Sequence, residues 1–185
     1  MGGNVLDFLN NSKKGQMIQH QNFIIFASYS TKDIEKIKPI LHQISQIQGV
    51  RIFFADANLQ PGDIISQRIT QNIIGADIFL VFYSESAKES SYVQQEIGVA
   101  LGQNKIIIPL LLDQTKPTGM LADRHYLDLS DEQKRLLDFG RLYNFIVNNI
   151  QNKNQRQLWS ALAILGIGAL LLSANQNPDE DDEYY

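Results

Sequence analysis

The stretch "ADIFLVFYS" (76–84) decides the fold of this chain of 185 residues. From Ile78 to Tyr83 every residue is apolar, without the polar alternation of a strand that has one face in water. Strands of this kind occur in parallel sheets that helices cover on both faces. The stretch therefore predicts a central strand of an α/β domain.

Other apolar runs rich in β-branched and aromatic residues precede and follow this stretch, separated by segments with helical spacing. Alternation of strand and helix predicts an open parallel sheet of five strands with a flavodoxin-like order 2-1-3-4-5. The further predicted strands are 22–28, 50–55, 105–112 and a weaker one at 125–129.

Polar residues gather at one edge of this predicted sheet. Ligands of such sheets bind beyond the carboxyl ends of the strands, where the strand order reverses. Here that point lies between the first and third strands, next to "SYSTKD" (28–33), "DANLQPGD" (56–63) and "YSES" (83–86). The hydroxyls of 28–31 suit either of two roles, a cradle for phosphate oxygens or a helix N-cap.

One carboxylate in "SSYVQQEIGVALG" (90–102) stands out from its helix. Glu96 falls about 60° from the centre of the apolar stripe that includes Val93 and Ile97, and Tyr92 lies one turn before it. Two interpretations remain open. Glu96 is a boundary residue whose stem packs while its head reaches water, or it is a carboxylate aimed into a ligand site. In the second case we expect Glu96→Gln barely to change stability, because the residue does not anchor the core.

Composition excludes several classes of site. The chain has no cysteine, and His20, His42 and His125 lack ligand spacing, so we expect no metal site. Five of the 20 acidic residues lie in the last seven residues, and the rest of the chain is nearly neutral. This balance predicts no nucleic-acid partner.

Composition also changes along the chain. We expect a leader or short docking segment at 1–21, a folded domain at 22–150, a basic linker at 151–157, an apolar helix at 158–174 and an acidic tail at 175–185.

The segment 158–174 has seventeen residues without a charge, the lower limit for crossing a bilayer. Trp159 suits a membrane interface, and Lys153 and Arg156 precede the segment, so the positive-inside bias places the domain in the cytoplasm. We therefore expect a C-terminal transmembrane helix in the inner (cell) membrane. A buried or self-associating helix is the alternative.

Three stretches resemble the Toll/interleukin-1 receptor (TIR) domains, in particular those of bacteria. The stretch at 23–33 resembles the first conserved box of that family. Residues 49–84 resemble its second strand, BB loop and third strand, and 90–101 resemble its catalytic helix. The family usually has tryptophan where Tyr92 stands. The resemblance covers about 22–150 and implies a TIR fold.

The resemblance implies that Glu96 is the catalytic glutamate of an enzyme that cleaves the nicotinamide-ribose bond of NAD, as in Thoeris-like antiviral defence. The product would be a linear, cyclic or conjugated ADP-ribose that a downstream effector reads. NAD would be the substrate, with no cofactor and no metal. The expected substrate-binding residues are Ser28, Tyr29, Ser30, Asp56, Ser84 and Tyr92.

The BB loop implies self-association as well. Its L-x-x-G element runs from Leu59 to Gly62 and includes Pro61, a turn signal. TIR enzymes commonly assemble so that the BB loop of one subunit completes the site of its neighbour. A non-catalytic TIR adaptor that acts through homotypic contacts is the alternative function, because one fold hosts both roles.

Overall fold

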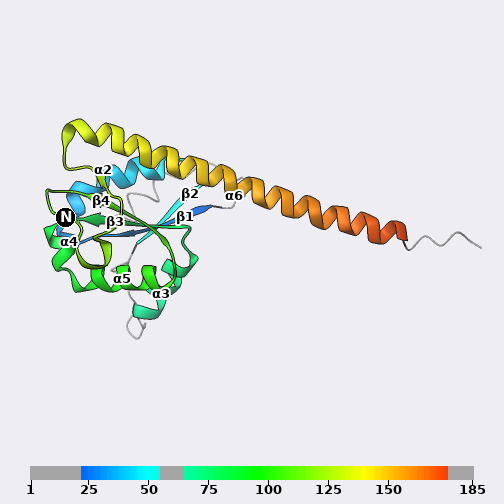
Figure 1. The fold of residues 1–185 in the computed structure, drawn as a ribbon, viewed down its shortest axis with the longest axis horizontal. Coiled ribbons are helices and arrows are strands. Elements are labelled where there is room, and N and C mark those ends of the chain that lie inside the picture. Colours follow the sequence, from blue (N-terminus) through cyan, green and yellow to red (C-terminus); the bar gives the residue numbers. More distant parts are fainter. Residues whose placement is uncertain (1–21, 55–64, 175–185) are drawn as a thin grey trace, which may run out of the picture. The chain divides into compact units, whose positions relative to one another are not determined.

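Five parallel strands form one sheet in the order β2-β1-β3-β4-β5, which confirms the predicted fold class and strand order (Figure 1). The computed structural model describes residues 22–54 and 65–174, without the side chains of 65–66 and 157–174. The strands are β1 (Phe23–Ser28), β2 (Val50–Phe54), β3 (Ile78–Tyr83), β4 (Ile106–Leu111) and β5 (Leu127–Asp128).

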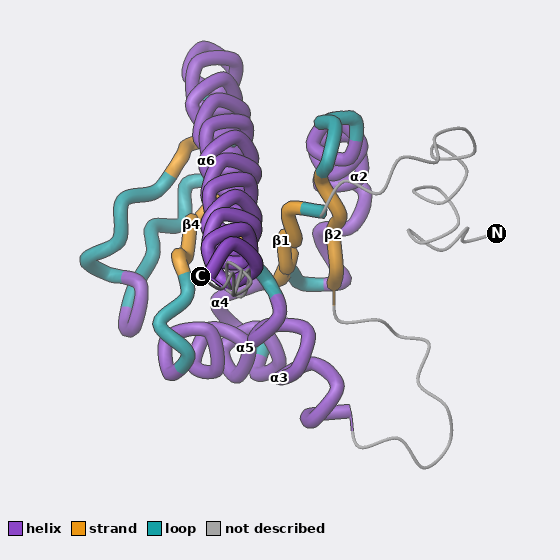
Figure 2. Tube along the Cα trace, turned by 90° about the vertical axis from the view of Figure 1, so that its right-hand side faces the viewer, coloured by secondary structure: helices purple, strands orange, loops and turns teal. Residues whose placement is uncertain are grey.

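The helices connect these strands and cover both faces of the sheet. Figure 2 shows α3 and α5 side by side on one face and α2 on the other. The helices are α2 (Ile34–Ser45), α3 (Ile65–Gly75), α4 (Glu85–Glu89), α5 (Ser91–Gly102) and α6 (Glu132–Ala174), with 3-10 turns η1 (Thr31–Asp33) and η2 (Gly119–Leu121).

The central position of β3 follows from its composition. All six residues of β3 are buried, because β1 and β4 pair with its two edges and helices cover its two faces. In the register, Phe26 lies beside Phe79, and their rings stack with centroids 5.4 Å apart. Both belong to an apolar cluster that includes Val93 and Ile97 of α5. Helix α5 is therefore fixed against the face formed by β1 and β3.

Helix α6 differs from the prediction. A folded domain ending at residue 150 and a separate linker at 151–157 were expected, but one helix runs through both, from Glu132 to Ala174. The segment 151–157 contains neither Pro nor Gly, so nothing in it interrupts a helix. The chain divides into two units, 1–147 and 148–185, and α6 contributes residues to both.

Among the residues whose side chains the structure describes, no helix is long and apolar enough to cross a membrane. The side chains of the predicted transmembrane segment 158–174 lie outside the described residues. The leader at 1–21 and the acidic tail at 175–185 lie outside them too.

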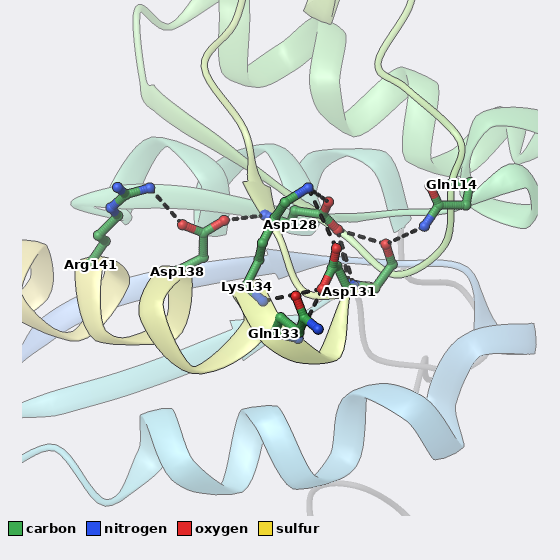
Figure 3. Close-up of polar contacts among 8 residues, drawn as sticks. Gln114, Asp128, Asp131, Gln133, Lys134, Asp138 and Arg141 are labelled. Carbon is green, nitrogen blue, oxygen red and sulfur yellow. Dashed lines mark hydrogen bonds and ion pairs between the residues drawn. The ribbon is translucent and has the colours of Figure 1, made fainter.

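A buried aspartate closes the outer edge of the sheet (Figure 3). Asp138, near the start of α6, accepts a hydrogen bond of 2.8 Å from the backbone N–H of Asp128, in the end strand β5. Its other oxygen lies 2.8 Å from Arg141, whose side chain is mostly exposed. The carboxylate thus supplies an edge N–H with the acceptor that a further strand would provide.

This arrangement predicts that Asp138→Ala lowers the free energy of unfolding by about 1–3 kcal/mol, because the Asp128 N–H loses its acceptor. Arg141→Ala, which removes only the exposed ion-pair partner, should cost less than about 1 kcal/mol. Urea denaturation of both variants measures the difference. Equal losses would show that the ion pair, rather than the edge hydrogen bond, carries the stabilisation.

Candidate active site

The carboxyl ends of β1 and β3 meet where the strand order reverses. β1 ends at Ser28, and Ser84 follows β3 directly. β2 lies on one side of β1, and β3 lies on the other. This is the position at which doubly wound sheets bind ligands. The predicted edge, at which the strand order reverses, is therefore present.

Glu96 is buried at this edge. Ser90 is the N-cap of α5, and its hydroxyl accepts a hydrogen bond of 3.4 Å from the N–H of Val93. Glu96 lies in the second turn of this helix. Only 5% of Glu96 is exposed. The interpretation of Glu96 as a boundary residue with its head in water is therefore wrong, since the end of β1 covers the helix at this turn.

The partner of Glu96 is Ser28. The Ser28 hydroxyl donates a buried hydrogen bond of 2.5 Å to Oε2 of Glu96. These two residues are 68 positions apart in the sequence, and the fold brings them together at the end of β1. Both residues belong to the predicted site, Glu96 as the catalytic residue and Ser28 as a substrate-binding residue, and the fold brings them into direct contact.

Burial changes the acidity of this carboxyl group. Removal from water raises the pKa of Glu96 from 4.5 to about 7, and the hydrogen bond from Ser28 opposes this rise. The group therefore changes its protonation state around neutral pH. Titratable groups with such shifts at a crevice are candidates for catalysis.

A second buried carboxylate, Asp33, was not among the predicted site residues. Asp33 accepts a hydrogen bond of 2.5 Å from the Ser84 hydroxyl, which itself accepts one of 3.0 Å from the N–H of Ala87. Lys36 lies 3.7 Å from the other oxygen of Asp33. This contact ties the loop after β1 to the loop after β3. The only sequence signal was the place of Asp33 in the stretch 28–33.

The other predicted substrate-binding residues lie in different surroundings. Tyr29 is half-buried and packs edge to face on Phe54, with ring centroids 6.3 Å apart. Ser30 is buried and accepts a hydrogen bond of 3.4 Å from the N–H of Lys32, as the N-cap of η1. Tyr92, expected to form an aromatic wall, is 68% exposed in the first turn of α5. Their binding roles stay predictions.

Four predicted residues lie outside the described residues. They are Asp56, expected to bind substrate, and the BB-loop residues Leu59, Pro61 and Gly62. Within 22–54 and 65–174, the structure contains no group of three or more His, Cys, Asp or Glu side chains placed to hold a metal ion. The described edge holds two buried carboxyl groups, Glu96 and Asp33, each of which accepts a hydrogen bond from a serine hydroxyl.

Comparison with known proteins points to one family. A family model described as "TIR domain" matches residues 25–142. A Brachypodium distachyon protein named "Probable 2' cyclic ADP-D-ribose synthase BdTIR" is 25% identical over 105 residues, which is 56% of this chain and 46% of that protein. The chain thus matches less than half the length of this relative.

A solved structure shares the fold. The TIR domain of the Toll-related receptor TRR-2 from Hydra magnipapillata superposes with a TM-score of 0.58 at 20% identity. The superposition covers 66% of this chain and 96% of that domain.

Burial of Glu96 predicts a pH-dependent stability. The pKa of Glu96 is about 7 in the folded state and 4.5 in the unfolded state. Between these two pH values the unfolded state has lost the proton and the folded state still binds it, so the free energy of unfolding falls as pH rises. The loss amounts to about 3 kcal/mol above pH 7. Glu96→Gln removes the titrating group, so the variant should gain stability relative to the natural chain over this range.

Urea denaturation at pH 4.5, 6 and 8 measures this difference. Glu96→Gln was expected to leave stability nearly unchanged, but burial of the carboxyl group limits that outcome to pH values near 4.5. A constant difference between the two proteins at all three pH values would contradict the burial of an ionisable Glu96.

Proposed function

Because the chain belongs to the TIR-domain family, we propose that it is an enzyme that cleaves NAD at the bond between nicotinamide and ribose. The products are nicotinamide and an ADP-ribose that is linear, cyclic or conjugated. The name of the Brachypodium relative supports this substrate, since a cyclic ADP-ribose is NAD without its nicotinamide. A role in antiviral defence, with an effector that reads the product, belongs to the same proposal.

The buried pair of Ser28 and Glu96 carries the proposal. A carboxylate that serves only solubility or helix stability has no reason to lose water at the end of β1. Burial without a cationic partner costs stability, and such costs are typical of functional sites. The site lies at the edge where this class of sheet binds nucleotides.

The reaction suits a single carboxylate. Nicotinamide carries a positive charge in NAD and leaves as a neutral molecule, taking the electron pair of the bond to ribose C1′. Positive charge then develops on the ribose ring, and ionised Glu96 stabilises it at low dielectric. A water molecule or a hydroxyl group of the substrate adds to C1′ and loses a proton, which completes hydrolysis or cyclisation.

This mechanism predicts the effect of Glu96→Gln. The variant keeps the shape and hydrogen-bonding capacity but lacks the charge, so we expect kcat to fall by about 10²–10³. Nicotinamide release, with products resolved by mass spectrometry, measures it in dilute and crowded solutions. Glu89→Gln, the same change at an exposed glutamate at the end of α4, is the matched control and should retain full activity.

The pH dependence provides a second measurement on the same proteins. Since the ionised carboxylate is the active form, kcat/KM of the natural enzyme should rise with pH and level off above a pKa of about 7. Turnover retained in Glu96→Gln would contradict the catalytic role. Absence of turnover by the natural chain in both solutions would favour the adaptor function.

Location at the membrane is part of the proposal as well. It rests on the uncharged segment 158–174, the basic residues before it and the acidic tail after it. In this proposal the TIR domain lies in the cytoplasm, held at the inner membrane by its C-terminus. The BB-loop residues Leu59, Pro61 and Gly62 then bring neighbouring domains together.

We predict that the full chain sediments with membranes and that a chain truncated after Gln151 is soluble, because the truncation removes the uncharged segment. Ultracentrifugation of cell extracts, with and without detergent, measures both. The anchor proposal fails when the full chain stays in the supernatant without detergent.

A further inference from the structure

Ser28 is a polar residue on an apolar face of the sheet. In the parallel register, Ser28 lies beside Val81 and Phe26 lies beside Phe79, so these four residues share one face. The other three belong to the apolar cluster packed against α5. Only 1% of Ser28 is exposed. A hydroxyl in this place requires a buried partner, and Glu96 provides it.

The hydrogen bond uses the only proton of the Ser28 hydroxyl. A serine hydroxyl has one O–H to donate, and here it is donated to Oε2 of Glu96. Ser28 therefore has no proton left to give to a substrate while this bond exists. Among the described residues, no hydrogen bond reaches the other carboxylate oxygen, Oε1. The two oxygens of Glu96 are thus unequal.

We propose that Ser28 is a positioning residue, which holds Oε2 of Glu96 so that Oε1 is the oxygen directed at the reacting ribose. The part that concerns Oε1 and ribose rests on the proposed function, whereas the action of Ser28 on Glu96 does not. Ser28 was predicted to bind substrate directly. In this proposal it acts on the substrate only through Glu96.

The position of Ser28 suits this role. Ser28 is paired with Val81 of β3, and the preceding residue, Ala27, is paired with both β2 and β3, so the strand backbone at this end of β1 is held in place. A glutamate side chain has several rotatable bonds, and a hydrogen bond from a fixed strand residue limits its conformations. Placement of a reacting group within a fraction of an ångström raises the rate of reaction.

The Ser28 hydroxyl affects the ionisation of Glu96 as well as the position of its carboxyl group. It donates to the ionised form of Glu96 and opposes the effect of burial on the pKa. Loss of the hydroxyl should therefore raise the pH at which Glu96 ionises by about one pH unit. A residue with a merely structural role would change stability without moving this titration.

The test uses Ser28→Ala, Ser28→Thr, which keeps a hydroxyl, and Ser45→Ala as the matched control. Ser45 is also buried, but its hydroxyl donates to the backbone carbonyl of His42 in α2. Glutamate labelled with 13C at the side-chain carboxyl gives an NMR signal for Glu96, assigned by its loss in Glu96→Gln. The signal is followed from pH 5 to pH 9, and kcat/KM for NAD is measured over the same range.

We expect the Glu96 midpoint to move up by about one pH unit in Ser28→Ala and to return to its natural value in Ser28→Thr. Ser45→Ala should leave it unchanged. The acidic limb of the kcat/KM profile should move together with the NMR midpoint. Because Glu96 is protonated near pH 5, the folded state of Ser28→Ala can be verified there by its NMR spectrum before titration.

An unchanged midpoint in folded Ser28→Ala would overturn the inference, even if NAD turnover by the natural enzyme confirmed the proposed function. A shifted midpoint with no NAD turnover by the natural chain would support the contact and overturn the proposed function, together with the role of Oε1. The two failures are therefore distinguishable.

Discussion

Burial of the Glu96 carboxyl group against the end of β1 is the constraint on which the site depends. An ionised carboxylate loses favourable contacts with water when it is buried, and here the described partner is a neutral hydroxyl, not a cation. The apolar packing of α5 against β1 and β3 must supply the stability that this burial costs. The site and the core thus share the same helix, and the rigidity of the core positions the carboxylate.

The sheet topology explains why these residues meet. Because β1 lies between β2 and β3, the chain reverses its direction of winding at β1, and the loops after β1 and β3 leave the same edge. Ser28 faces α5, whereas the contact between Ser84 and Asp33 ties the two loops together. One buried serine positions the carboxylate, and the other fixes the frame around it.

Much of this fold was predictable because a buried parallel sheet has a strong sequence signal, as in the apolar run of β3. Burial of Glu96 was not predictable, because helical periodicity describes α5 by itself and places this residue at the edge of the apolar stripe of that helix. The strand end that covers it is 68 residues away in the sequence. Asp33 was missed for the same reason, because its partner Ser84 belongs to another loop. Local patterns also placed a break after residue 150, where α6 continues.

We propose that buried Glu96 faces the nicotinamide end of bound NAD, and this placement can be measured by titrating Glu96 with a ligand bound. An NAD analogue with carbon in place of the ribose ring oxygen keeps the cationic nicotinamide but resists cleavage. At saturation, we expect the 13C carboxyl signal of Glu96 to shift and its pKa to fall below about 7, because a nearby cation favours the ionised form. An unchanged signal and midpoint with the analogue bound would show that Glu96 does not face the nicotinamide.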